Sequence, residues 1–215
     1  MSRATTSRIV EPRTNMTDRA NLKRAPGGAT LRRRALDAAQ TLLEEGGIEG
    51  LHLRDIADKA DSAVASLYYH FADKEALLTE LATQGWRDLG LKIGRAMERQ
   101  ASSHRVDDAS ASYLQFIHDH PQLYALMQSR PILAGDARAR AAEHEAYAVF
   151  RSALDGDDRV PAAQVENVSL LLWVLGRGIA AAMLAAGDED ASAAKQLRTK
   201  VLSGFGFLLS PHLRS

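Results

Sequence analysis

The stretch that decides the fold is LHLRDIADKADSAVASLYYHFADKEALL, residues 51–78. Apolar residues recur at helical spacing in two short runs within it, at 53–60 and at 64–71. The Asp61-Ser62 pair between the runs consists of residue types that favour turns and helix caps. Asp73 precedes a third apolar period and is expected to cap it. Because two helices this short must share one core across a tight corner, the pattern predicts a helix-turn-helix.

Polar residues make the pattern more specific than the apolar spacing alone. The segments RDIA (54–57), LYYHF (67–71) and DKEALL (73–78) together resemble the DNA-binding signature of the TetR family of bacterial transcriptional regulators. The resemblance covers roughly residues 30–80, and several ordered pieces must coincide for it to arise by chance. A helical corner in an unrelated all-α protein would explain the apolar stripes but not the Tyr, His and Lys positions.

The resemblance implies an all-α fold of about nine helices. A homeodomain-like helix-turn-helix unit of three helices would come first, and a larger helical domain for ligand binding and dimerisation would follow. We therefore divide the chain into a disordered basic arm at 1–28, a DNA-binding domain at 29–80 and the larger domain at 81–215. The first helix of the DNA-binding domain is expected to begin at Ala29 or Thr30.

The composition favours a cytoplasmic protein and excludes several kinds of site. Cysteine is absent from the 215 residues, which excludes a disulfide framework, a thiolate metal site and a cysteine nucleophile. The first residues, MSRATTSRIVEPRTNMTDRA, have no apolar core, so they do not form a secretory signal.

The basic residues are concentrated near the N-terminus. Residues 1–34 contain nine Lys or Arg against Glu11 and Asp18, a net charge of +7, whereas the whole chain is neutral. A basic arm beside a helix-turn-helix is expected of a DNA-binding protein. Such arms reach phosphates or the minor groove, although a solvated tail has the same composition and stays an open alternative.

The resemblance also implies which residues contact DNA. Tyr68 and Lys74 match positions that bind the DNA backbone, although helical spacing alone also allows Tyr68 as a core aromatic. The third helix would enter the major groove, while the first helix, the second helix and the start of the fourth would bind phosphates. Leu67 and Phe71 are assigned to the core. The full set of expected DNA contacts is Arg32, Arg33, Arg34, His52, Arg54, Ala63, Val64, Ala65, Ser66, Tyr68, Tyr69, His70 and Lys74.

Three departures from the family pattern concern the corner and the reading face. Asp61, Ser62 and Ala63 stand where the family usually has Gly, a hydrophobe and Ser or Thr. Asp tolerates a left-handed turn, and we expect Ser62 to take over the capping of the third helix. His52 replaces the usual Ser or Thr at the start of the second helix. The reading face has no Arg, Asn or Gln, so specificity would rest on thymine methyls, Ser, Tyr and His contacts, DNA shape or the arm.

Helical periods fill the rest of the chain. A fourth helix from Asp73 to about Gln100 is expected to join the two parts, followed by a helix that ends near His120. The next helix would open at Pro121 and be closed by Pro131, and another would begin at Asp136. An eighth helix would begin at Pro161, after a turn at 155–161.

That eighth helix contains an apolar segment, VSLLLWVLGRGIAAAMLAAG at 168–187, which we expect to pair with a partner subunit. A membrane span is the alternative, but Arg177 at its centre would cost about 2.5–3.5 kcal/mol in a bilayer. The segment resembles one type of TetR ligand-binding domain, which has a Trp-x-x-x-His-Gly motif, with Arg177 at the His position. A ninth helix to about Leu209 would complete the homodimer contact. The expected interface residues are Trp173, Gly176, Gly178, Leu197, Val201 and Phe205.

Large side chains of the second domain form the candidate ligand site. A small apolar or amphipathic ligand among them would move the fourth helix and change the spacing of two DNA-reading helices. The same side chains would also make an ordinary core, and this alternative stays open. The set is Trp86, Tyr113, Phe116, Tyr124, Met127, Tyr147 and Phe150.

No set of residues predicts catalysis, a metal or a cofactor. His118 and His120, and the run at 143–145, place their side chains on different sides of a helix, so neither converges on one point. The sequence therefore predicts a homodimeric regulator, not an enzyme, that binds a pseudo-palindromic double-stranded DNA operator and is released by a ligand, as in a repressor. A non-specific architectural DNA-binding protein and a helical-bundle enzyme are the alternatives.

Overall fold

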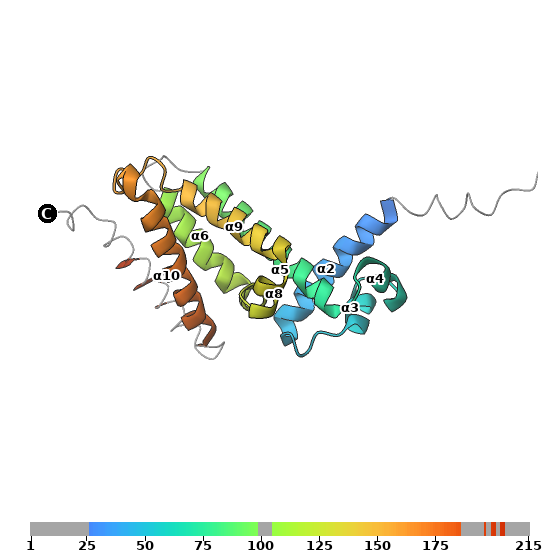
Figure 1. Ribbon diagram of the computed structural model, residues 1–215. Coiled ribbons are helices and arrows are strands. Elements are labelled where there is room, and N and C mark those ends of the chain that lie inside the picture. The colour runs from blue at the N-terminus through green and yellow to red at the C-terminus, as the bar shows by residue number, and fades with distance from the viewer. Residues whose placement is uncertain (1–25, 99–104, 186–195, 197–198, 201–202, 205–215) are drawn as a thin grey trace, which may run out of the picture.

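The computed structural model describes residues 26–98, 105–185, 196, 199–200 and 203–204, and every regular element in these residues is a helix. Figure 1 shows two parts, with α2, α3 and α4 in one, α6, α8, α9 and α10 in the other, and α5 between them. The elements are α2 (Pro26–Gly46), α3 (Leu53–Lys59), α4 (Val64–His70), α5 (Lys74–Met97), α6 (Arg105–Asp119), α7 (Pro121–Met127), α8 (Arg130–Gly135), α9 (Ala137–Ser152), the 3-10 turn η2 (Ala162–Gln164) and α10 (Val165–Ala185).

The first helix begins at Pro26, earlier than the predicted Ala29 or Thr30. Proline has no N–H to lose in a first turn and its φ already suits a helix, so it extends α2 into the segment predicted to be the arm. Residues 1–25 of that arm lie outside the described part of the chain. The helix ends at Gly46, after which Gly47 adopts a φ of +68° and donates its N–H to the Leu43 carbonyl at 2.8 Å.

The helix-turn-helix shares one core with α2 and α5, as the spacing predicted. Leu43, Ile56, Leu67 and Leu77 come from four different helices and are all buried. Burying each of these side chains contributes roughly 1.5–3 kcal/mol, so the two short helices are stable only as part of this unit.

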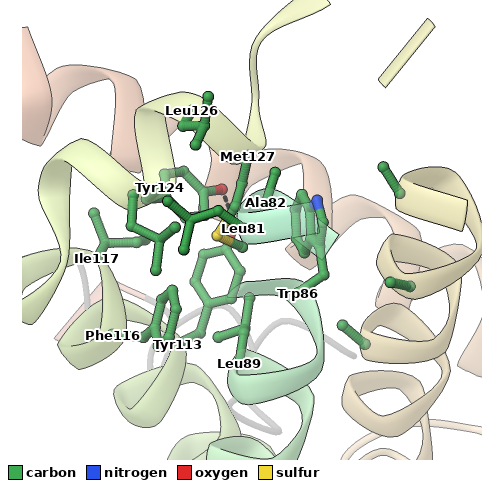
Figure 2. Close-up of a cluster of buried hydrophobic side chains, with 14 of the residues drawn as sticks. Leu81, Ala82, Trp86, Leu89, Tyr113, Phe116, Ile117, Tyr124, Leu126 and Met127 are labelled. Atoms are coloured by element: carbon green, nitrogen blue, oxygen red, sulfur yellow. Dashed lines mark hydrogen bonds between the residues drawn. The ribbon is translucent and has the colours of Figure 1, made fainter. Parts of the chain in front are cut away.

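The long helix α5 connects the two parts, which confirms the predicted role of the fourth helix. Its buried residues run along its whole length, from Leu77 in the DNA-binding unit to Trp86 and Ile93 in the larger part. It ends at Met97, close to the predicted Gln100. Figure 2 shows its residues Leu81, Trp86 and Leu89 facing side chains of α6 and α7.

The larger part contains one helix that the sequence did not predict. Pro121 begins α7 and Asp136 caps α9 as expected, with the Asp136 carboxylate accepting from the Arg138 and Ala139 N–H groups. However, Pro131 lies in the first turn of the additional helix α8 and does not simply close α7, which already ends at Met127. The prediction was wrong here because proline is as compatible with a helix start as with a helix end.

One helix within the described residues, spanning Ala162–Ala185, is long and apolar enough to cross a membrane, and 39% of its apolar window is buried. Its apolar residues divide between two faces. Trp173 and Ile179 are buried against the protein, whereas Leu171 and Val174 are exposed. The central Arg177 forms an ion pair with Glu143 of α9 at 2.8 Å, so its charge is paired inside the larger domain.

Candidate DNA-binding interface and aromatic cluster

The third helix of the DNA-binding unit, α4, presents its tyrosines to solvent. Tyr68 is 55% exposed and Tyr69 73% exposed, which excludes the alternative that Tyr68 is a core aromatic. Ala65 lies on the same outer surface, and His70 packs edge-on against the Tyr69 ring at 5.4 Å between centroids. Leu67 and Phe71 are buried and attach α4 to the core, as predicted. The outer face can therefore contact a partner without disturbing the fold.

The corner between α3 and α4 depends on a left-handed residue. Asp61 has a φ of +51° and is the one non-glycine residue with positive φ in the part of the chain that the structure describes. The Arg34 guanidinium, from α2, donates to the Ala60 carbonyl at 3.0 Å and to the Asp61 carbonyl at 3.5 Å. This arginine therefore satisfies carbonyls at the end of α3, where intrahelical donors run out.

The expected capping by Ser62 is wrong. Ala63 occupies the N-cap position of α4 and provides no side-chain hydrogen bond, while the Ser62 hydroxyl donates to the Ala63 carbonyl at 3.2 Å. The serine is one position too early to reach the free N–H groups of the first turn.

We expect Asp61→Val to lower the free energy of unfolding by about 1–2 kcal/mol, because a β-branched residue is strained at positive φ. Asp61→Gly is the matched variant, since glycine adopts this conformation freely and removes the same exposed side chain. Urea denaturation of the two variants measures the difference. Equal stabilities would contradict the left-handed conformation at this corner.

The three consecutive arginines of α2 have different surroundings. Arg32 pairs with Glu80 at 3.1 Å, and its guanidinium carbon lies 5.6 Å from the centre of the Phe71 ring. Arg34 donates to the carbonyls at the corner, whereas Arg33 is exposed and pairs with Asp37 one turn along the same helix. All three predicted phosphate contacts therefore also have partners within the protein, and the Arg33 pair is the most exposed of them.

The remaining predicted phosphate contacts surround the start of α3 and α5. His52 is the exposed N-cap residue of α3 and forms no side-chain capping bond, and Arg54 is also exposed. Lys74 is half-buried, and its ammonium donates to the Ile48 carbonyl at 3.1 Å. Asp73 caps α5 as predicted by accepting from the Ala76 N–H at 2.7 Å.

Aromatic side chains from five helices meet in the larger domain. The Trp173 ring of α10 lies between 5.3 and 5.6 Å, centroid to centroid, from the rings of Tyr113, Tyr147 and Phe150. Trp86 of α5 lies 6.2 Å from Trp173. We call these five residues, together with Tyr124 of α7, the aromatic cluster (Figure 2 shows Trp86, Tyr113 and Tyr124).

The structure places the predicted ligand residues mainly in the interior. Trp86, Tyr113, Tyr124, Phe116, Met127 and Phe150 are all buried, and Tyr147 is half-buried. A cavity of about 570 Å³ lies beside them between α5 and α9, and of the seven predicted residues only Trp86 lines it. Its other lining residues are Arg87, Gly90, Leu91, Gly94, Arg95, Glu98, Glu145, Ala146 and Val149. The sequence does not predict this cavity, because its lining depends on how residues 86–98, in and just after α5, pack against residues 145–149 of α9.

Two buried tyrosines in the cluster are hydrogen-bonded to each other. The Tyr113 and Tyr124 hydroxyls form this bond, and Gln128 donates its amide N–H to the Tyr124 oxygen at 3.0 Å. Burial disfavours the phenolate, which raises the pKa of Tyr124 to about 12 and the pKa of Tyr113 well above its ordinary value. Both side chains therefore stay neutral throughout the physiological range.

Because Tyr113 and Tyr124 are buried in the neutral form, we expect the free energy of unfolding to fall at alkaline pH. Unfolded tyrosines lose their protons near a pKa of about 10, so above that pH the folded state binds more protons and its stability falls as pH rises. The contribution of Tyr124 is complete below about pH 10, is lost up to about pH 12 and amounts to roughly 2–3 kcal/mol. Urea denaturation across this range should show a weaker pH dependence for Tyr124→Phe than for Tyr69→Phe. The same dependence in both variants would contradict the prediction.

The predicted dimer-interface residues do not share one surface. Trp173 and Gly176 face the protein interior, where a Cβ on Gly176 would lie 3.0 Å from the Tyr113 ring. Gly178 is exposed. Leu197, Val201 and Phe205 lie outside the described residues.

Comparisons with known proteins agree with this architecture. The sequence model for "Bacterial regulatory proteins, tetR family" matches residues 35–81, and that for "Tetracyclin repressor-like, C-terminal domain" matches residues 106–200. Together they cover more than half of the chain, and they coincide with the two parts of the fold. The first matched region contains the corner and both exposed tyrosines.

Individual relatives are more distant. The HTH-type transcriptional repressor KstR of Mycobacterium tuberculosis is 35% identical over 65 residues, 30% of each chain. An uncharacterized HTH-type transcriptional regulator of the same species is 30% identical over 131 residues, 58% of this chain and 63% of the relative. The chain thus spans under a third of the KstR relative's length. A solved structure of a protein of unknown function from Rhodococcus sp. RHA1 has a TM-score of 0.67 and 26% identity, covering 81% of this chain and 92% of that one. The two matched models and the shared fold show that this chain belongs to the tetR family of bacterial regulatory proteins.

Proposed function

We propose that this protein is a cytoplasmic transcriptional regulator that binds an operator in double-stranded DNA through the outer face of α4. The observation that carries the proposal is the exposure of Tyr68 and Tyr69 on a helix whose opposite face, at Leu67, is buried. A helix of this kind fits the major groove, and its neighbouring basic residues can bind phosphates on either side. The KstR relatives bear the name of repressors, which supports repression as the mode of action here.

The proposed regulator is a homodimer. The exposed residues Leu170, Leu171, Val174 and Leu175 form an apolar face on α10 that a second copy would cover. This face replaces Trp173 and Gly176, which the fold buries, as the proposed contact. A two-fold axis would place two α4 helices against successive major grooves of a pseudo-palindrome.

The proposed ligand is small and apolar or amphipathic, and it binds in the cavity between α5 and α9. The floor of that cavity is formed by Trp86, Gly90 and Ala146, and its rim contains both arginines and glutamates. Trp86 also has a buried indole N–H without a hydrogen-bond partner among the residues that the structure describes. We further propose that the domain is of the Trp-x-x-x-His-Gly type, with Arg177 at the His position and paired with Glu143.

Fluorescence anisotropy tests the DNA-binding function. The labelled fragment is the DNA immediately upstream of the protein's own gene, and a scrambled fragment of equal length is the control. We expect at least 10-fold tighter binding to the upstream fragment at every salt concentration, because base contacts add to the salt-dependent phosphate contacts. Equal affinities with a steep salt dependence would indicate the architectural protein instead.

A further inference from the structure

The helix α2 of the DNA-binding unit provides the cap of a helix in the larger domain. The Glu44 carboxylate accepts the N–H of Gln122 at 3.1 Å with one oxygen and the N–H of Leu123 at 3.0 Å with the other. These amides belong to the first turn of α7, whose own N-cap residue His120 forms no side-chain capping bond. Free amides at a helix start favour an anion, so this contact joins the two domains through charge-assisted hydrogen bonds.

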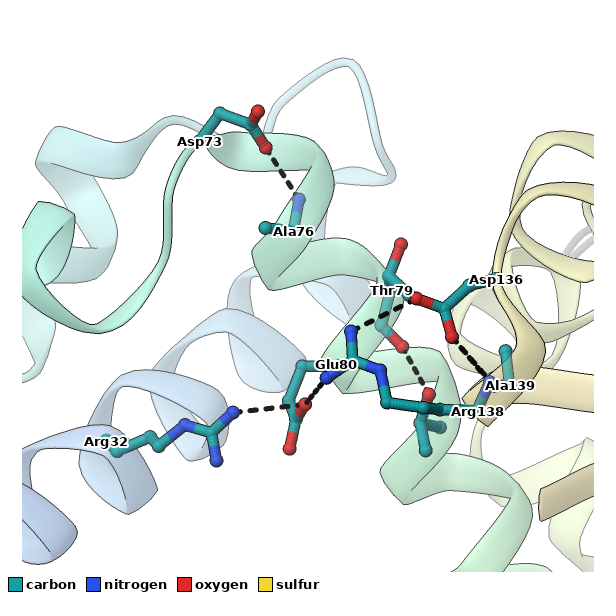
Figure 3. A network of polar contacts seen from close by, with 9 residues as sticks. Arg32, Asp73, Ala76, Thr79, Glu80, Asp136, Arg138 and Ala139 are labelled. Atoms are coloured by element: carbon teal, nitrogen blue, oxygen red, sulfur yellow. Dashed lines mark hydrogen bonds and ion pairs between the residues drawn. The ribbon is translucent and has the colours of Figure 1, made fainter. Parts of the chain in front are cut away.

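A second carboxylate joins α2 to the larger domain nearer the other end of the helix. Glu80 of α5 has a side chain only 14% exposed and pairs with Arg32 of α2 at 3.1 Å. The same Glu80 oxygen lies 3.7 Å from Arg138 of α9, which Asp136 also binds at 3.0 Å. Figure 3 shows Glu80 between the two arginines. Thus α2 contacts α7 through Glu44 and reaches α9 through Glu80.

Both contacts lead to the aromatic cluster and the cavity. The helix α7 carries Tyr124, and its Met127 packs so closely on α5 that a Cβ on Gly85 would lie 2.6 Å from the Met127 sulfur. The helix α9 contributes Ala146, whose Cα would lie 3.4 Å from a Cβ on Gly90 of α5. Because these helices are in close contact, a group that enters between them displaces α7 or α9. Glu44 joins α7 to α2 and Glu80 links α9 to α2, so either displacement also moves α2.

We propose that Glu44 and Glu80 are positioning residues that couple the aromatic cluster and cavity to the DNA-binding unit by joining α2 to α7 and α9. The inference rests on the proposed DNA-binding function. In this coupling α2 moves with α7 and α9, in addition to any movement of α5. Coupling between two sites is reciprocal, so DNA bound at α4 changes the cluster to the same extent that a cluster ligand changes DNA affinity. The coupling can therefore be measured with DNA alone, without a ligand.

The two tryptophans of the chain make this measurement possible, because Trp86 and Trp173 both belong to the aromatic cluster. The probe is a double-stranded fragment that the full-length protein selects from random DNA. At saturation with this fragment we expect a shift in tryptophan emission in the unmodified protein. In Glu44→Gln or Glu80→Gln the shift should fall to half or less, and in the double variant it should disappear.

Glu45→Gln is the matched control. Glu45 is adjacent to Glu44 and carries the same charge, but its partner is Lys59 of α3 inside the DNA-binding unit, at 3.6 Å. The full emission shift should persist in this variant. A shift of the same size in the Glu44 and Glu80 variants, or bound DNA with no shift in any protein, overturns the inference and leaves the proposed function intact. Failure to select or bind any DNA overturns the proposed function and the inference with it.

Amide hydrogen exchange of the unmodified protein tests the same coupling without a substitution. The Gln122 and Leu123 amides, which donate to Glu44, should exchange at least 5-fold more slowly when the selected DNA is bound. Unchanged exchange at both amides with DNA bound overturns the inference, even where a variant fails to fold.

Discussion

Replacing Trp86 with alanine is expected to lower the free energy of unfolding by about 3–5 kcal/mol. The Trp86 ring of α5 is fully buried, and its centroid lies 6.2 Å from those of both Tyr124 of α7 and Trp173 of α10. The substitution removes a large apolar surface and leaves a cavity that these packed helices cannot close. Urea denaturation monitored by circular dichroism measures the loss.

Leu91→Ala is the control for this substitution, because Leu91 lies on the same helix but is 55% exposed. It should change stability by less than about 1 kcal/mol. Trp86→Phe should be less damaging than Trp86→Ala, because a phenyl ring still fills part of the space and the indole N–H, which has no partner among the described residues, is removed. A loss below about 1.5 kcal/mol for the alanine variant would contradict the packing of the cluster.

The second large effect is on DNA binding. Tyr69→Ala should weaken binding to the selected operator by about 10-fold or more, because a base contact is worth roughly 1–3 kcal/mol. The free energy of unfolding should change by less than about 0.5 kcal/mol, because the ring is 73% exposed. Anisotropy titrations against the operator and a scrambled fragment measure the effect on affinity.

Tyr68→Ala separates the two proposed kinds of contact. If Tyr68 binds the backbone and Tyr69 faces the groove, Tyr68→Ala weakens binding to both fragments equally, whereas Tyr69→Ala weakens binding to the operator alone. The same reduction on both fragments for Tyr69→Ala would contradict its role in reading bases. Wild-type affinity in both variants would remove α4 from the interface.

Local sequence patterns predicted the DNA-binding unit well because its signals are short-range. The spacing of Ile56 and Leu67, the cap Asp73 and the left-handed Asp61 are properties of neighbouring residues, and the structure confirms each. The failure at Ser62 is also local, since a shift of one position decides whether a hydroxyl reaches the first free amides.

The contacts between the two domains could not be predicted in this way. Glu44 and Leu123 are 79 residues apart, and nothing in either local pattern indicates that one caps the other. For Arg32 and Arg34 the sequence predicts DNA contacts alone, because their internal partners, Glu80 and the Ala60 carbonyl, are distant in the chain.

The sequence also does not predict which face of α10 packs against the protein. A helix that is apolar nearly all round has no pattern that distinguishes an inner from an outer face. Only packing shows that Trp173 and Gly176 point inward while Leu171 and Val174 point outward. The proposed dimer face therefore depends on the fold, although the presence of an apolar helix could be read from the sequence.

Selection of binding sites from random double-stranded DNA by the full-length protein tests the central claim most directly. The account predicts enrichment of one pseudo-palindrome, whose half-sites lie about 10–10.5 base pairs apart, or a multiple of that, centre to centre, because two α4 helices would occupy successive major grooves. The Tyr69→Ala variant should lose this enrichment at equal salt. Recovery of DNA with no shared sequence, at any salt concentration that permits binding, would contradict the claim that this protein reads an operator.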